Sequence, residues 1–173
     1  MPTYETKYNL TGSVITAVDL IKGIGVYAGL DVINVPGATG YLDTNYLGKA
    51  NYALKSLSVK DFIFVHVESP DECGHNGDTK GKIRAIEDFD KLVVGTILKG
   101  IKRFKDFRIL VTADHATPIA IMTHARGMVP FAIYGTGIAG SGIAGFNEAC
   151  IEKSKLKISK GHNLISDLFF EMA

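Results

Sequence analysis

The 173-residue sequence predicts an α/β fold, a three-layer sandwich built on a mostly parallel sheet. Short apolar runs of strand length alternate along the chain with longer stretches in which apolar residues recur at helical spacing. In the clearest case, a helix over 79–103 with Ile83, Ile86 and Val93 on its apolar face separates two apolar runs. Strand, helix and strand in this order, from 62 to 113, predict a crossover between parallel neighbours.

The remaining elements follow the same alternation. We predict strands over 12–18, 31–35, 61–68, 107–113 and 129–134. We predict helices over 20–29, 44–57, 79–103 and 163–171, the first three capped by Asp19, by Asp43 or Thr44, and by Asp78 or Thr79. The stretch from 135 to 145 carries five glycines and is predicted to be a mobile loop. No repeat or linker divides the chain, so we expect a single domain over 1–173.

The composition excludes several classes of partner. The 19 basic and 18 acidic residues are interspersed, so the sequence has no basic stripe for nucleic acid. Two cysteines are too few for a disulfide framework, which indicates a reducing compartment. The amino terminus has no apolar leader, and no uncharged run approaches the roughly 18 residues of a membrane span. We therefore expect a cytoplasmic protein that binds neither nucleic acid nor membrane.

Potential metal ligands follow two of the predicted strands. The apolar run from 109 to 112 leads into Asp114 and His115, and the run from 61 to 68 leads into Asp71 and His75. Either pair alone is also compatible with a polar turn that ends a strand. Carboxyl ends of parallel strands meet at one edge of a sheet, where ligands bind in open α/β folds. The two pairs are therefore predicted to lie near each other.

These four residues and His124, from a later loop, form a set of carboxylates and imidazoles. Such ligands suit Mn²⁺ or Zn²⁺, and also Co²⁺ or Fe²⁺. Five ligands exceed the need of one open site, and two neighbouring ions can stabilise phosphoryl transfer. We predict that one ion binds Asp71, His75 and His124, and that the other binds Asp114 and His115 with ligands still to be found.

Three further residues have two interpretations each. Lys22 follows the first strand and is either a solvated surface lysine or a group that holds a phosphate or carboxylate. His66 is a hydrogen-bonded core histidine, a residue that orients a metal ligand, or a ligand itself, and the first two interpretations are favoured. Cys73 could bind a soft metal, but we interpret it as a buried packing residue with an inert thiol.

Five segments of the sequence together resemble a known family. They include Pro70-Asp-Glu-Cys-Gly-His75 and Asp114-His-Ala-Thr-Pro118, and they span residues 18–25, 35–40, 64–75, 114–118 and 129–135. This set resembles the archaeal-type 2,3-bisphosphoglycerate-independent phosphoglycerate mutases of the alkaline phosphatase superfamily, from about Tyr4 to the carboxyl terminus. The resemblance implies an alkaline phosphatase-like fold and interconversion of 3-phosphoglycerate and 2-phosphoglycerate.

The resemblance also implies roles for individual residues. Two ions, commonly Mn²⁺, would be bound with the division of ligands given above, and Lys22 would hold the phosphate of the substrate. In the family, a serine is transiently phosphorylated and an aspartate completes the second metal site, both in an amino-terminal segment. None of the serines in this sequence stands in the motif of that nucleophile.

We therefore expect this chain to be the carboxyl-terminal portion of a longer enzyme, inactive by itself and with an incomplete sheet. Two alternatives stay open at this point. One is a related two-metal phosphotransferase or phosphatase, for example one resembling homoserine kinases. The other is a non-catalytic metal-binding domain on the same scaffold.

Overall fold

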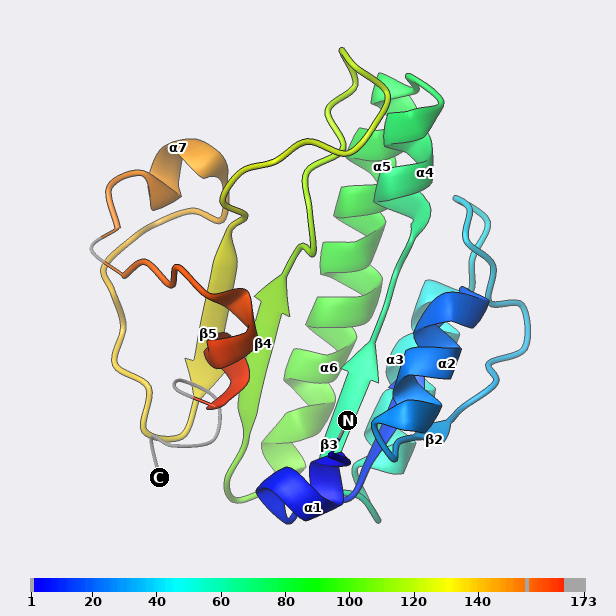
Figure 1. The fold of residues 1–173 in the computed structure, drawn as a ribbon, viewed down its shortest axis with the longest axis vertical. Coiled ribbons are helices and arrows are strands. Elements are labelled where there is room, and N and C mark those ends of the chain that lie inside the picture. The colour runs from blue at the N-terminus through cyan, green and yellow to red at the C-terminus, as the bar shows by residue number, and fades with distance from the viewer. Residues whose placement is uncertain (1, 155, 167–173) are drawn as a thin grey trace. The chain divides into compact units, whose positions relative to one another are not determined.

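A computed structural model describes residues 2–154 and 156–166 and confirms the predicted α/β class (Figure 1). The chain divides into two compact units, each of which is described by itself. The first comprises Met1–Arg103 and Thr117–Thr123, and the second comprises Phe104–Ala116 and His124–Ala173. Among the described residues, no helix is both long enough and apolar enough to cross a membrane.

The first unit contains a parallel sheet of three strands in the order β2-β1-β3. These are β1 (Gly12–Ile15), β2 (Asp31–Val32) and β3 (Phe62–Val65), all shorter than predicted. The register pairs Gly12 with Phe62 and Ile15 with Val65. Neighbouring residues of a strand point to opposite faces, yet Val14 and Ile15 are 1% and 0% exposed, so β1 is covered on both faces.

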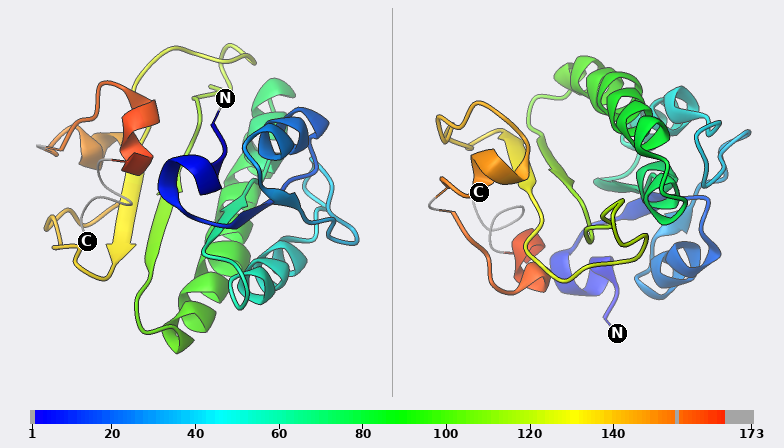
Figure 2. Two further views of the ribbon diagram at one scale, coloured as in Figure 1. Left: turned by 60° about the horizontal axis from the view of Figure 1, so that its bottom comes forward. Right: turned by 90° about the horizontal axis from the view of Figure 1, so that it is seen from above.

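Helices lie on the two faces of this sheet (Figure 2). On one face, α2 (Asp19–Tyr27) packs so closely on β1 that a Cβ at Gly25 would lie 2.5 Å from Cγ1 of Val14. On the other, α3 (Tyr46–Ser56) buries Ala53 against Ile15 and Val35. The first unit is therefore three-layered, as the sequence predicts.

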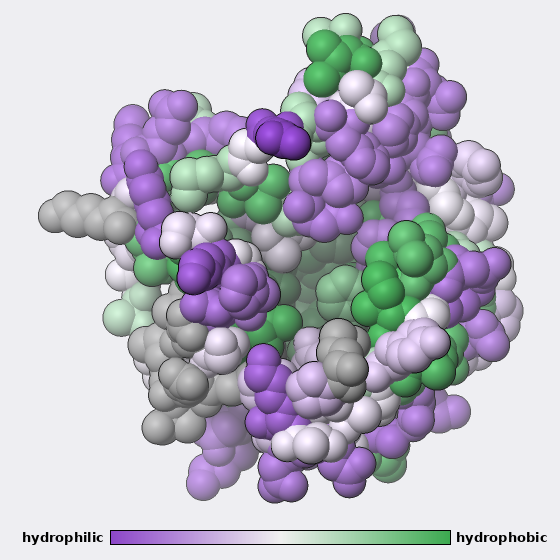
Figure 3. All heavy atoms as spheres, in the orientation of Figure 1, coloured by the Kyte–Doolittle hydropathy of each residue, from purple (hydrophilic) through white to green (hydrophobic). Residues whose placement is uncertain are grey.

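The outer side of α2 is unusually apolar. Leu20, Ile24 and Val26 are 70%, 50% and 64% exposed, and Figure 3 shows apolar side chains gathered over this helix. The cap predicted for α2 is wrong, because Asp19 lies within the first turn and Val18 is the N-cap residue. In α3, Asn45 rather than Asp43 or Thr44 caps the helix, through its side-chain oxygen and the N–H of Gly48.

The helical segment predicted over 79–103 is confirmed, although it is not uniform. It consists of α5 (Thr79–Asp88), a π-helical turn η1 (Phe89–Val94), α6 (Gly95–Gly100) and a 3₁₀ turn η2 (Ile101–Arg103). Asp78 caps it, as predicted, by accepting from the N–H of Gly81 at 2.9 Å. Val93 is buried, but Ile83 and Ile86 are 54% and 51% exposed. The predicted apolar face is therefore wrong over α5. Hydrogen bonds in η1 span five residues instead of the four of an α-helix, so η1 rotates the face of α5 relative to that of α6.

Several short helices escaped prediction. These are α1 (Tyr4–Tyr8), α4 (Ser69–His75), α7 (Glu148–Ile151) and the 3₁₀ turn η3 (Gly161–Asn163). Five to seven residues, or fewer, cannot show an apolar repeat, so periodicity gives no signal for them. The helix predicted over 163–171 lies largely outside the described residues, which end at Ser166.

The second unit contains a two-stranded antiparallel sheet of β4 (Arg108–Thr112) and β5 (Phe131–Gly135). Its register pairs Arg108 with Gly135 and Thr112 with Phe131. The prediction that the strand over 107–113 pairs in parallel with the strand over 61–68 is wrong, since β4 pairs only with β5 within the described residues. An apolar run does not specify its partner, because parallel and antiparallel ladders both satisfy its backbone groups.

Candidate functional site

In the first unit, Asp71 and His75 share one face of α4. Helix α4 begins where β3 and its following residues end, with Pro70 in its first turn, where a missing N–H costs nothing. Residues four apart on a helix are neighbours, and Nε2 of His75 lies 3.4 Å from Oδ2 of Asp71. Both side chains are about one third exposed. The helix therefore presents a carboxylate and an imidazole together to solvent.

The backbone carbonyl of Met122 fixes the orientation of the His75 ring. Nδ1 of His75 lies 3.0 Å from this oxygen, and because a carbonyl can only accept, Nδ1 donates. In the neutral ring, Nε2 is then an acceptor that faces a carboxylate oxygen, and two acceptors at 3.4 Å repel each other. A proton or a cation between them relieves this repulsion. The donor set and its geometry therefore fit a divalent ion.

The loop 117–123 is fastened to α4 and α5. Thr117, which is 4% exposed, donates from its hydroxyl to Oδ1 of Asp71, and its carbonyl accepts from Nζ of Lys82 at 2.6 Å. Gly74 permits this approach, since a Cβ there would lie 2.7 Å from the carbonyl oxygen of Thr117. The hydroxyl of Thr117 and the carbonyl of Met122 thus orient the two side chains of α4.

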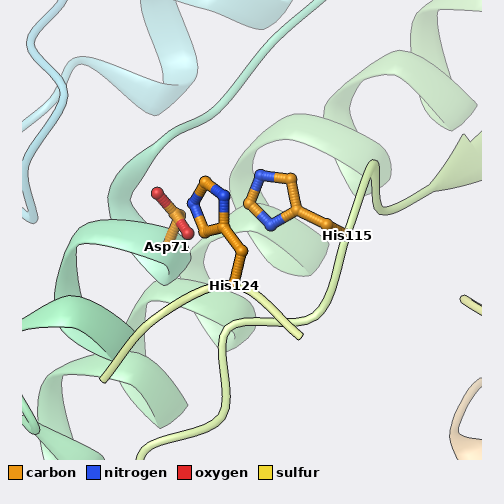
Figure 4. A group of neighbouring side chains, drawn as sticks. All are labelled: Asp71, His115 and His124. Carbon is orange, nitrogen blue, oxygen red and sulfur yellow. The ribbon is translucent and has the colours of Figure 1, made fainter. Parts of the chain in front are cut away.

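In the second unit, His115 and His124 lie against each other. Their ring centroids are 3.7 Å apart with 31° between the planes, and Nε2 of His115 lies 3.3 Å from Oδ2 of Asp114. An isolated antiparallel bridge between Ala116 and Ala125 aligns the two segments next to these histidines. Figure 4 shows Asp71 on α4, and His115 and His124 on separate loop segments. His115 and His124, which are predicted from the sequence to bind different ions, are therefore neighbours.

Lys22 and Cys73, singled out above, have simple surroundings. Nζ of Lys22 donates to Oδ1 of Asp19 at 2.9 Å on the surface of α2, and this hydrogen bond, with the charge of Lys22, lowers the pKa of Asp19. Burial, aided by the charge of Asp78, raises the pKa of the Cys73 thiol, which agrees with its interpretation as a packing residue.

His66 is hydrogen-bonded, as the favoured interpretation requires. Its Nδ1 lies 3.1 Å from both Oε1 of Glu68 and Oγ1 of Thr16. Glu68 also binds Lys49, whose side chain is 0% exposed. Sequence reasoning missed Lys49 and Glu68, although Lys49 falls on the apolar face of its helix with Tyr46 and Ala53, a position that signals burial.

Sequence reasoning also missed Thr117 and Lys82. Thr117 is part of the Asp-His-Ala-Thr-Pro motif, and its place two residues after His115 was the available signal. Lys82 carries no comparable signal, because a lysine in a polar helix surface usually points into solvent.

Comparisons with known proteins agree with this chemistry. The family model described as Metalloenzyme superfamily matches residues 1–165. The chain is 55% identical over 167 residues to the 2,3-bisphosphoglycerate-independent phosphoglycerate mutase of Methanosarcina barkeri, and 51% identical over 168 residues to that of Methanosarcina acetivorans. These alignments cover 95% and 96% of this chain but 42% of each relative, so the chain spans less than half their length.

Two solved structures are similar to the fold. The PH0037 protein from Pyrococcus horikoshii gives a TM-score of 0.82 at 32% identity, covering 87% of this chain and 45% of that one. The cofactor-independent phosphoglycerate mutase of Thermoplasma acidophilum gives 0.66 at 24% identity, covering 98% of this chain and 38% of that one, and supports the fold alone. The family resemblance predicted from the five segments is confirmed by the similarity to the two Methanosarcina proteins.

Proposed function

The chain belongs to the Metalloenzyme superfamily, and from this we propose that it forms the metal-binding part of a 2,3-bisphosphoglycerate-independent phosphoglycerate mutase. The reaction would interconvert 3-phosphoglycerate and 2-phosphoglycerate, so the partner is a small phosphorylated substrate. The observation that carries the proposal is the Asp71–His75 pair, whose facing acceptors at 3.4 Å suit a cation. We further propose a cytoplasmic location, in keeping with a glycolytic substrate.

Two divalent ions are proposed, with Mn²⁺ as the first choice and Zn²⁺ or Co²⁺ also compatible with oxygen and nitrogen ligands. Asp71, His75 and His124 would hold one ion, and Asp114 and His115 would contribute to the other. Chain connectivity supports the set of ligands, although not its division between two ions. His115 is two residues before Thr117 and His124 is two residues after Met122, and consecutive Cα atoms are about 3.8 Å apart. Thr117 and Met122 are the residues that contact Asp71 and His75.

The residues of this chain would act mainly by positioning. Bound ions supply positive charge that stabilises a phosphoryl group in transfer. Met122 keeps His75 in the tautomer with an acceptor Nε2, and Thr117 restricts rotation of the Asp71 carboxylate. Lys22 would hold the substrate phosphate. Its present bond to Asp19 is an exposed ion pair that contributes little, so a phosphate can replace it.

We assign the nucleophile's role to no serine of this chain. In the proposed reaction, a phosphoserine intermediate would form on a serine outside this sequence. The chain alone, supplied with Mn²⁺, is accordingly expected to leave 3-phosphoglycerate unchanged.

A chimera tests the proposal directly. In the mutase of Methanosarcina barkeri, the matching 42% of the length is replaced by this chain, which is 55% identical to it. The purified chimera is expected to convert 3-phosphoglycerate into 2-phosphoglycerate in the presence of Mn²⁺ and to lose this activity with a chelator. The matched control carries Asp71→Asn and His75→Ala and is expected to be folded but inactive.

The alternatives give different products in the same assay. Release of inorganic phosphate without 2-phosphoglycerate would indicate a phosphatase, and phosphorylation of homoserine by ATP would indicate a kinase. A folded chimera that binds Mn²⁺ without any turnover would favour the non-catalytic domain. Each of these results would contradict the proposed mutase function.

A further inference from the structure

A buried carboxylate joins the two loops that follow β1 and β3. Oε1 of Glu68 accepts from Oγ1 of Thr16 and from the backbone N–H of Ala17, both at 2.8 Å, and from Nδ1 of His66 at 3.1 Å. Oε2 accepts from Nζ of Lys49 at 2.9 Å. Glu68 is 5% exposed, and it is also the N-cap residue of α4. One side chain is thus bonded to the residues that follow β1, to the residue that follows β3 and to α3.

The charge of this carboxylate is fully matched by donors. Burial would by itself raise the pKa of Glu68, but the hydrogen bonds from His66 and Lys49 and the charge of Lys49 hold it well below its usual range. Lys49 completes its own bonding through the carbonyl of His66 at 2.9 Å. A buried ion pair of this kind rarely adds stability over an apolar replacement, whereas its directional bonds restrict geometry.

The bonded groups lie next to residues with proposed functional roles. Thr16 and Ala17 form the turn between β1 and α2, whose first turn carries Lys22. On the other side, Asp71 comes three residues after Glu68, and its N–H donates to the carbonyl of Glu68 at 2.9 Å. Parallel pairing of β1 and β3 brings both turns to the same edge of the sheet.

We propose that Glu68 is a positioning residue that couples the turn carrying Lys22 to the helix carrying Asp71. Its carboxylate fixes the separation between the phosphate-holding and metal-holding groups of this unit. The roles of Lys22 and Asp71 rest on the proposed function, but the coupling rests on the contacts of Glu68 alone.

Amide hydrogen exchange of the intact chain tests this coupling without metal or substrate. Thr16→Val removes a hydroxyl that donates to Glu68 and accepts from the N–H of Val18 at 3.1 Å, and it keeps the shape of the side chain, so the chain is expected to fold. Loss of the bond to Glu68, about 1 kcal/mol, is expected to speed exchange about fivefold at the N–H groups of Asp71 and Glu72, some 50 residues away in the chain. Thr16→Ser retains the hydroxyl and is expected to restore slow exchange.

Tyr46→Phe is the matched control. It removes the 2.6 Å bond between Tyr46 and Ser69, which also holds the start of α4 but does not reach the β1 turn. Exchange is expected to rise at Asp71 and to stay unchanged between Ala17 and Lys22. In Glu68→Gln, exchange is expected to rise in both segments.

Two results would overturn the proposal. In the first, Thr16→Val speeds exchange only within residues 16–18. In the second, Tyr46→Phe loosens the Ala17–Lys22 segment as much as Glu68→Gln does, so that general destabilisation explains both. Titration of the wild-type chain with Mn²⁺ is a separate measurement: absence of binding would refute the proposed function and leave the exchange result standing.

Discussion

At the scale of single residues, the two proposed metal ligands on α4 are oriented by neighbouring residues that are not themselves proposed as ligands. Asp71 is held by the hydroxyl of Thr117, and His75 by the carbonyl of Met122. Met122 has φ of 50°, a left-handed conformation that is unfavourable for a residue with a Cβ. The loop thus accepts local backbone strain while it directs a carbonyl toward His75.

Replacing Thr117 by valine tests its effect on Asp71. The hydroxyl is lost while the volume is retained, so rotation of the carboxylate is no longer restricted. Mn²⁺ affinity, measured by isothermal titration calorimetry on the 173-residue chain, is expected to fall about tenfold. The free energy of unfolding is expected to fall by about 1 kcal/mol. Thr117→Ser should restore both quantities, and unchanged Mn²⁺ affinity in Thr117→Val would remove Thr117 from the site.

At the scale of elements, the same substitution should have opposite effects in two helices. Gly74→Ala in α4 places a Cβ 2.7 Å from a backbone carbonyl, and overpacking of this kind costs about 1–3 kcal/mol. Gly23→Ala in α2 meets nothing within 4 Å, so the helix propensity of alanine should raise stability by about 1 kcal/mol. Urea unfolding of the two variants measures both changes. Equal effects would show that loop 117–123 does not pack closely on α4 in solution.

The elements also show what sequence can and cannot predict. The helix beginning at Thr79 was predicted with its cap because Asp78 precedes a long apolar repeat. Helix α4 was not, because its seven residues include Pro70 and Gly74 and contain no repeat. The position of Asp71 and His75 after a strand marked both as candidate ligands, but their contact depends on the i,i+4 spacing along this helix. Hydrogen-bond partners such as Thr117, Lys82 and Glu68 depend on tertiary contacts that local pattern does not encode.

At the scale of the whole molecule, the backbone passes between the two compact units three times, at 103–104, 116–117 and 123–124. His115 and His124 stand next to the last two of these passages. An ion that binds only the folded state stabilises that state by mass action.

Addition of Mn²⁺ is therefore expected to protect residues 114–125 from amide exchange. At about 100 times the dissociation constant, an ion specific to the folded state adds about 2.7 kcal/mol to the free energy of unfolding. The measurement is exchange with and without Mn²⁺, and EDTA should reverse the protection. Asp71→Asn with His75→Ala should weaken it, because the residues proposed for the second ion, Asp114 and His115, remain. Equal protection in this variant would show that the ion binds elsewhere.

The stability of the whole chain should also depend on the charge of Glu68 below neutral pH. Its pKa is lowered on folding because donors from His66, Lys49 and Ala17 outweigh the effect of burial. The stabilisation is therefore complete above the unfolded-state pKa, about 4.3, and is lost progressively as the pH falls below it, because the unfolded chain then binds the proton more readily. The free energy of unfolding in urea, measured from about pH 7 to about pH 3, should show this loss.

Glu68→Gln provides the contrast for this measurement. At neutral pH it leaves the buried ammonium of Lys49 without its carboxylate, so the variant should be clearly less stable than the wild-type chain. As the pH falls, protonation of Glu68 in the unfolded chain removes this advantage of the wild type, so the difference in stability should be largest above about pH 5 and narrow below about pH 4. A difference that is constant with pH would mean that the variant is destabilised by its altered hydrogen-bonding pattern, and that the charge of Glu68 has no part in holding the turn after β1 to the start of α4.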